Sequence, residues 1–251
     1  MNKSYTELHH FTPEAGTRVA YRLRPGTGPT LVFLPGYASE MDGAKALALD
    51  AFAATRGLAM LRFDYSGTGA SGGRFEDGTL GGWLAEARDM VDALTAGPLI
   101  LIGSSMGGWL ALHLALGIAD RVAALVGIAA APDFTDWGFT ADEQQQLCET
   151  GRLERRREPG TEPQLTTHGF WQSGQSLRLL GGPIALDCPV HLIHGAEDAD
   201  VPPSIALRLM AQLRSADVQL TLVKGGGHRL SEPHEIAAIV RTVAALVEPE
   251  Q

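Results

Sequence analysis

The sequence predicts an α/β protein in which a mostly parallel central sheet is covered by helices on both faces. Short apolar runs alternate with helix-like stretches along most of the chain, which is the order that parallel strands joined by crossover helices require. The apolar runs are continuous, as expected for strands that are buried on both faces. The length of 251 residues is enough for one large domain of this class.

The expected elements follow one another in a regular order. Strands are predicted at residues 31–34, 58–63, 98–102, 122–129, 189–193 and 218–223. Helices are predicted at residues 44–55, 80–94, 109–116, 203–213 and 235–247. In the second helix, apolar residues recur every three or four positions, and the first helix ends near Gly57, a residue type that favours helix C-termini.

The stretch from residue 133 to residue 187 interrupts the alternation and shows no clear strand. Its large aromatic residues include Trp137, Phe139, Phe170 and Trp171. An insertion between two strands of an open α/β sheet lies over the carboxyl edge, where ligands bind. We therefore expect an α/β core of residues 1–132 and 188–251 with a cap insertion at 133–187. The alternative is an excursion of helices without substrate contact.

The basic run inside this insertion admits two interpretations. Its arginines are Arg152, Arg155, Arg156 and Arg157. They either attract the carboxylate of an acidic substrate or form a solvated helical face of the cap, and the second interpretation is favoured.

Composition excludes several classes of function. A net charge of −9 and an isoelectric point of about 5.3 argue against binding to nucleic acid. Cys148 and Cys188 form neither a disulfide framework nor a metal quartet, and they suit a reducing compartment. The first residues show neither a secretory nor a transit pattern, and no apolar run reaches membrane-spanning length. We expect a cytoplasmic protein without a membrane span.

The motif Gly103-Ser104-Ser105-Met106-Gly107 predicts a nucleophilic serine. It reads G-x-S-x-G and lies between an apolar strand and an apolar helix. A serine at such a sharp turn is held in a strained backbone conformation and needs small neighbours. The alternative is a turn rich in glycine and serine without chemistry, and the strand–turn–helix setting favours the nucleophile.

A serine hydroxyl needs a general base, and the base needs an acid to orient it. His228 follows three glycines and the strand at 218–223, so a bendable loop brings it toward Ser105, and it is preferred over the other seven histidines. Asp198, Asp200 and Glu197 share the loop after the strand at 189–193, and Asp133 follows an earlier strand. All four acids are candidates at this point.

Two backbone N–H groups are expected to hold the oxyanion that forms during acyl transfer. One belongs to Met106, the residue after the nucleophile, and the other to Tyr37, in the loop after the strand at 31–34. Gly36 lets the chain bend there.

A second glycine pattern, Gly67-Thr68-Gly69-Ala70-Ser71-Gly72, matches G-x-G-x-x-G but does not predict a dinucleotide site. Such a site opens a helix directly, with an acid ending the next strand. Here residues 73–78 intervene before the next helix, so we interpret the pattern as a structural turn.

These motifs resemble the α/β-hydrolase superfamily, and they run in the family's order from Phe33 to His228. Within it, the chain is similar to the mitochondrial palmitoyl-protein thioesterases that also act as acyl-glucuronide esterases. The similarity is carried by residues 33–37, 45–49, 62–67, 103–110, 191–195 and 228–229. Pro35-Gly36 stands where many relatives have His-Gly, a change that a main-chain donor tolerates. The lack of a transit pattern fits a bacterial relative.

The resemblance implies an α/β-hydrolase fold and hydrolysis of acyl thioesters and reactive esters by Ser105, Asp198 and His228. Asp198 fits the family's pattern H-G-x-x-D-x-x-V-P, whereas Asp200 falls in its spacer. We predict a serine hydrolase that needs no metal or organic cofactor and acts on a small molecule or an acylated protein. The alternatives are a carbon–carbon bond hydrolase or peptidase with the same three residues, and a ligand-binding module without catalysis.

Overall fold

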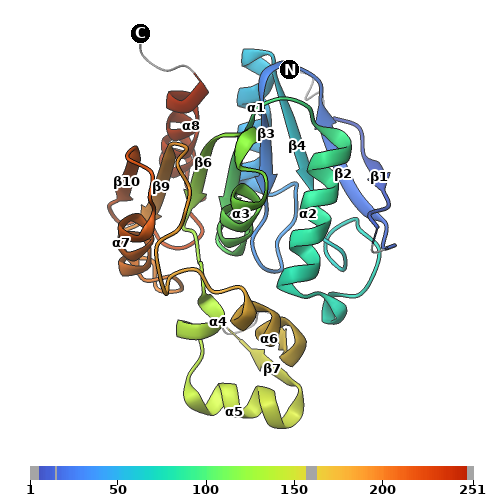
Figure 1. Cartoon of the computed structure of the whole chain (residues 1–251), viewed down its shortest axis with the longest axis vertical. Coiled ribbons are helices and arrows are strands. Elements are labelled where there is room, and N and C mark those ends of the chain that lie inside the picture. The colour runs from blue at the N-terminus through green and yellow to red at the C-terminus, as the bar shows by residue number, and fades with distance from the viewer. Residues whose placement is uncertain (1–5, 15, 157–162, 248–251) are drawn as a thin grey trace.

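An eight-stranded sheet forms the centre of the molecule, in the order β1-β2-β4-β3-β5-β6-β9-β10 (Figure 1). The computed structural model describes residues 6–14, 16–156 and 163–247. The six strands from β4 to β10 in this order pair in parallel, and β2 and β1 add antiparallel pairs at one edge. The predicted α/β class is confirmed.

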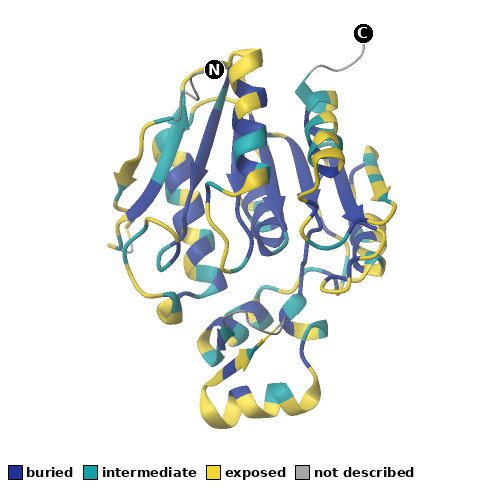
Figure 2. Ribbon diagram, turned by 180° about the vertical axis from the view of Figure 1, so that it is seen from behind, coloured by how far each residue is buried: buried dark blue, intermediate teal, exposed yellow. Residues whose placement is uncertain are grey.

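The six predicted strands all lie in this sheet. They are β3 (Thr27–Leu34), β4 (Leu58–Phe63), β5 (Leu99–Ser104), β6 (Val122–Ile128), β9 (Val190–Gly195) and β10 (Val218–Val223). The other two strands of the sheet are β1 (His9–Phe11) and β2 (Val19–Arg24). The central strands β3 to β6 are almost wholly buried because helices cover both of their faces (Figure 2).

Helices on the two faces enclose two separate hydrophobic cores. On one face lie α1 (Ala44–Arg56) and α8 (Pro233–Val247), and on the other lie α2 (Leu80–Leu94), α3 (Met106–Gly117) and α7 (Pro203–Gln212). Short 3₁₀ turns, η1 (Phe75–Asp77) and η2 (Ala119–Arg121), join elements of the core. The helix α1 ends at Gly57, which takes the left-handed conformation and caps Ala53, as the sequence predicts.

The described residues of 134–176 lie beyond one end of the sheet, at the bottom of Figure 1, and the chain then returns to the core, where Ile184 is buried. They contain α4 (Phe134–Trp137), α5 (Ala141–Thr150), β7 (Arg152–Arg155), β8 (Gln164–Thr167) and α6 (His168–Ser176). The expectation that this stretch holds no strand is wrong, because β7 and β8 pair as an antiparallel hairpin.

The described arginines of the basic run therefore do not form a helical face. Arg152 and Arg155 lie on β7, Arg156 follows it, and Arg157 lies outside the described residues. Only Leu153 of β7 is buried, where it packs with Phe139 and Leu147. One buried side chain in a four-residue strand is too weak a pattern to reveal it in the sequence.

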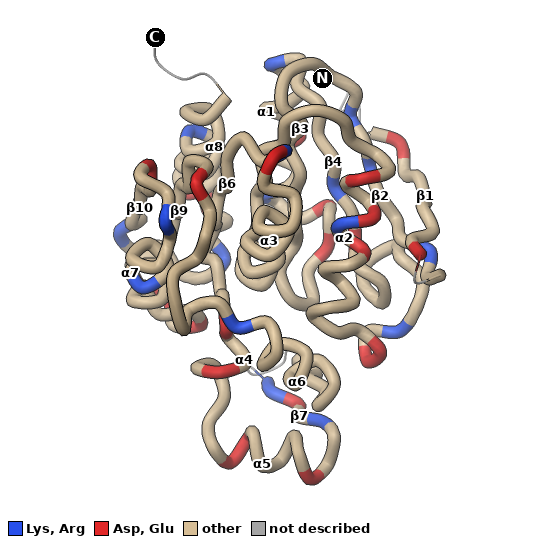
Figure 3. Tube along the Cα trace, viewed as in Figure 1, with Lys and Arg blue, Asp and Glu red and all other residues tan. Residues whose placement is uncertain are grey.

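Acidic and basic side chains are interleaved along the chain (Figure 3). Among the described residues, no helix has the length and apolar character needed to cross a membrane.

Candidate active site

Ser105 occupies a strained turn between β5 and α3. Its φ of 54° and ψ of −119° lie in a region that residues with a side chain rarely enter. Backbone hydrogen bonds hold the turn on both sides: the Ser105 N–H donates to Ile128 at 2.9 Å, and its carbonyl accepts from Gly108 and Ala131. The strain is thus maintained by the sheet and helix around it.

The two glycines of the motif are required by close packing of the backbone. A Cβ atom at Gly103 would lie 2.2 Å from the Gly107 carbonyl oxygen, and one at Gly107 would lie 2.0 Å from that of Leu34. Both positions are therefore closed to any residue larger than glycine.

The structure brings Ser105, His228 and Asp198 together from the loops after β5, β10 and β9. The Nε2 atom of His228 is 3.0 Å from Ser105 Oγ, and its Nδ1 is 2.8 Å from Asp198 Oδ2. A carboxylate only accepts hydrogen bonds, so this contact assigns the ring proton to Nδ1 and leaves the Nε2 lone pair facing the serine hydroxyl. This is the arrangement that a serine nucleophile and its base require.

The Asp198 side chain is fully buried and accepts hydrogen bonds at both oxygens. Oδ1 accepts from the N–H groups of Asp200 at 3.0 Å and Val201 at 2.8 Å, and Oδ2 accepts from His228 and, at 3.3 Å, from His194 Nε2. Burial alone would raise the pKa of Asp198, but the hydrogen bonds from His194, His228 and Val201 outweigh it and hold that pKa well below its ordinary value. The carboxylate is therefore ionised at neutral pH.

The other candidate acids occupy different places. Asp133 accepts the N–H groups of Leu179 and Leu180, each at 2.7 Å, and so ties the start of the 133–187 segment to its end. Asp200 and Glu197 have exposed side chains, and Asp200 lies at the cavity described below.

The other histidines occupy different places. His113 contacts the Leu177 carbonyl at 2.7 Å, and His168 packs on Trp171. His194 is the residue whose role the sequence did not reveal: its Nε2 lies 2.8 Å from the Val201 carbonyl as well as next to Asp198. The remaining four lie in β1, in β9 and at the start of α8: His9, His10, His191 and His234.

The two backbone donors predicted for the oxyanion lie beside Ser105. Met106 is the first residue of α3, where backbone N–H groups point outward and the helix dipole favours negative charge. The loop of Tyr37 packs on the turn, since a Cβ at Gly36 would lie 3.3 Å from Ser105 Cβ. Within the described ranges, neither the Tyr37 nor the Met106 N–H donates to a protein group. Their catalytic role stays a prediction.

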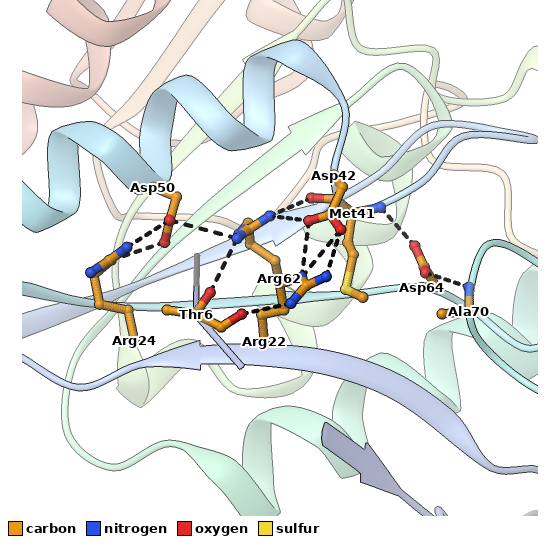
Figure 4. A network of polar contacts seen from close by, with 9 residues as sticks. All are labelled: Thr6, Arg22, Arg24, Met41, Asp42, Asp50, Arg62, Asp64 and Ala70. Atoms are coloured by element: carbon orange, nitrogen blue, oxygen red, sulfur yellow. Dashed lines mark hydrogen bonds and ion pairs between the residues drawn. The ribbon is translucent and has the colours of Figure 1, made fainter. Parts of the chain in front are cut away.

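Residues at the end of β4 hold the far end of the Tyr37 loop (Figure 4). The Asp64 carboxylate accepts the Met41 N–H at 2.6 Å and the Ala70 N–H at 2.9 Å. Arg62 donates to the Met41 carbonyl at 2.9 Å and pairs with Asp42. Burial raises the pKa of Asp64, partly offset by the two amides. The glycine-rich stretch after β4 is thus a structural turn, as interpreted from the sequence.

A cavity with an empty volume of about 570 Å³, open to solvent, lies over Ser105 and His228. Aromatic rings of the 133–187 segment line it, together with Tyr37 and polar groups of the hairpin; these residues are Phe134, Trp137, Phe139, Arg155, Gln164 and Thr166. The site therefore combines the Ser105 hydroxyl with a partly apolar pocket.

Arg155 belongs to the wall of this cavity and is fully engaged. Its guanidinium lies 4.3 Å from the centre of the Phe139 ring and donates to the Gly138 carbonyl at 2.9 Å. It also pairs with Glu143, whose pKa is lowered to about 2 chiefly by that contact. Arg155 thus joins β7 to α5.

Several known proteins are similar to this chain in sequence and in fold. Residues 31–239 match the family model described as the alpha/beta hydrolase family. The chain is 36% identical over 234 residues to the human mitochondrial palmitoyl-protein thioesterase ABHD10, covering 92% of this chain and 76% of that protein. A crystal structure from Agrobacterium vitis S4 has a TM-score of 0.91 at 40% identity and covers 97% of this chain and 100% of its own. Alpha/beta hydrolase domain-containing protein 10 from mouse has a TM-score of 0.90 at 33% identity, with 96% and 98% covered.

Proposed function

The chain belongs to the alpha/beta hydrolase family, and on that premise we propose that it is a serine hydrolase that cleaves carboxylic esters or thioesters. The observation that carries the proposal is the chain of contacts from Asp198 through His228 to Ser105, at 2.8 Å and 3.0 Å. The strained backbone of Ser105 and the cavity above it add support.

The proposed reaction proceeds through an acyl-enzyme. His228 Nε2 takes the Ser105 proton as Oγ attacks the carbonyl carbon, and the resulting oxyanion faces the N–H groups of Met106 and Tyr37. Collapse of this intermediate breaks the bond to the alcohol or thiol, which leaves with the proton from His228. Water then attacks the acyl carbon while His228 takes its proton. The bond from that carbon to Ser105 Oγ breaks, His228 returns the proton to Oγ, and the carboxylic acid is released.

We propose that residues 133–187 act as a cap that selects the acyl group. The aromatic rings of Phe134, Trp137 and Phe139 give the cavity an apolar side suited to a hydrocarbon chain. The name of the relative, a palmitoyl-protein thioesterase, favours a thioester of a fatty acid as substrate class.

A panel of acyl esters and acyl thioesters of increasing chain length tests this function, with the Ser105→Ala variant as control. We expect turnover by the wild type that is lost in the variant. Turnover of the panel by Ser105→Ala at the wild-type rate would contradict the proposal. Covalent labelling of Ser105 without turnover of any member would favour a peptidase or a carbon–carbon bond hydrolase with the same three residues.

The cytoplasmic location expected from the sequence is part of this proposal, although the named human relative is a mitochondrial protein. Fractionation of the source cells tests it: we expect activity in the soluble fraction, and recovery with membranes or organelles would overturn the expectation.

A further inference from the structure

The Tyr37 hydroxyl connects the loop next to Ser105 to the hairpin of the cap. Its Oη donates to the Leu165 carbonyl at 2.6 Å, across 128 positions of sequence. Leu165 lies on β8 between Gln164 and Thr166, both of which line the cavity. One residue therefore carries a main-chain N–H beside the nucleophile and a side-chain contact to the strand that walls the substrate cavity.

The ring of Tyr37 is wedged between cap and core. Its centre lies 4.6 Å from that of Phe170 and 6.1 Å from that of Phe134, both in the cap. On the core side, the ring of Phe75 lies 5.1 Å away and that of Trp83 lies 6.0 Å away. Burial raises the pKa of the Tyr37 hydroxyl, so it stays a donor at neutral pH. The ring is therefore packed against the cap and the core at once.

We propose that Tyr37 is a positioning residue that couples the cap hairpin to the oxyanion loop. The bond from its hydroxyl to Leu165 holds the Tyr37 N–H where the oxyanion forms. A substrate group that contacts β8 therefore changes the position of this N–H. The inference rests on the proposed function, since it needs an oxyanion to stabilise.

The hydroxyl bond is predicted to act on the transition state and not on substrate binding. The hydroxyl faces β8 and not the reacting atoms, and the ring that lines the cavity remains when the hydroxyl is removed. A shift of the oxyanion donor weakens stabilisation of the developing charge, whereas the cavity wall stays in place. The expected result is a lower kcat with an unchanged KM.

The Tyr37→Phe variant tests this, with Tyr21→Phe as the matched control. Tyr21 lies on β2 beside His9, away from the cavity. Both variants and the wild type are assayed with p-nitrophenyl esters of short and longer acyl chains, and the rate of covalent labelling by a fluorophosphonate is measured. We expect Tyr37→Phe to lower kcat and the labelling rate about tenfold, less than the roughly hundredfold cost of a 1 Å misplacement. Tyr21→Phe should match the wild type.

The coupling itself has a separate signature. In the wild type, kcat should rise once the acyl chain is long enough to reach β8, and this rise should disappear in Tyr37→Phe. An unchanged kcat, or a higher KM with kcat unchanged, would overturn the inference and reduce Tyr37 to a packing residue. Absence of turnover and of labelling in the wild type would instead overturn the proposed function.

A measurement on the wild type alone covers the case in which Tyr37→Phe does not fold. Amide hydrogen exchange is compared before and after Ser105 is phosphonylated. We expect the loop at residues 35–43 and the strand β8 to gain protection together. Protection of the loop without β8 would contradict the coupling.

Discussion

Replacement of Asp198 by Asn should abolish most of the activity while the fold is kept. The two oxygens of Asp198 face different partners: Oδ1 faces two backbone N–H groups, and Oδ2 faces the rings of His228, at Nδ1, and His194, which can both change tautomer. A backbone N–H can only donate a hydrogen bond, whereas an imidazole nitrogen can donate or accept, depending on the tautomer. The Asn side chain should therefore keep its oxygen toward Asp200 and Val201 and turn its NH₂ toward His228.

In that orientation the NH₂ group of Asn points at His228 Nδ1, which donates a hydrogen bond in the wild type. The ring must then accept at Nδ1 and carry its proton on Nε2, which lies 3.0 Å from Ser105 Oγ. A protonated Nε2 cannot act as base, and the same substitution in serine proteases lowers kcat by about 10⁴. The opposite orientation of the amide would leave the buried Val201 N–H and the part-buried Asp200 N–H unpaired, and an unpaired buried donor costs about 1–3 kcal/mol.

The assay is kcat and KM with a p-nitrophenyl ester, together with thermal unfolding. We expect kcat to fall by about 10⁴ with little change in KM, and the midpoint of unfolding to fall by roughly 2–4 °C for each kcal/mol lost. Glu197→Gln is the matched control, since its exposed side chain lies in the same loop and does not line the cavity, and it should stay close to wild type. A kcat for Asp198→Asn within tenfold of wild type would refute the reasoning.

Two further predictions concern packing and the cap. Gly107→Ala should prevent folding or lower the free energy of unfolding by more than about 3 kcal/mol, because its Cβ would lie 2.0 Å from a carbonyl oxygen. Gly151→Ala, with a φ of +77° and open space around it, should cost only about 1–2 kcal/mol in urea unfolding, and equal losses would contradict the steric argument. Because Arg155 lowers the pKa of Glu143 to about 2, the Glu143 carboxylate stabilises the fold fully above its ordinary pKa of 4.5, and this contribution is lost as pH falls toward 2. The difference in melting temperature between wild type and Glu143→Gln should therefore shrink across that range, and a difference that stays constant would contradict the ion pair.

The parallel strands could be predicted because both of their faces are buried. Such strands read as continuous apolar runs, and the loops after them meet at one edge of the sheet. That edge is why Ser105, Asp198 and His228 could be grouped without knowledge of the fold.

A strand could not be predicted where its charged side chains pair with residues that are distant in the sequence. Strand β2 carries Arg22 and Arg24, which give its sequence a polar pattern. Arg22 pairs with Asp42, 20 positions along the chain, and Arg24 pairs with Asp50, 26 positions along the chain (Figure 4). The contact from Tyr37 to the cap could not be predicted for another reason: its partner is a main-chain carbonyl, which carries no residue-specific signal.

Covalent trapping at Ser105 tests the central claim most directly. The wild type and the Ser105→Ala variant are treated with a fluorophosphonate, and the labelled peptide is identified by mass spectrometry. We predict one label, on Ser105 Oγ, with a matching loss of esterase activity, and no label on the variant. Labelling of Ser105→Ala at the wild-type rate, or loss of activity with the label on another residue, would contradict the assignment of Ser105 as the nucleophile.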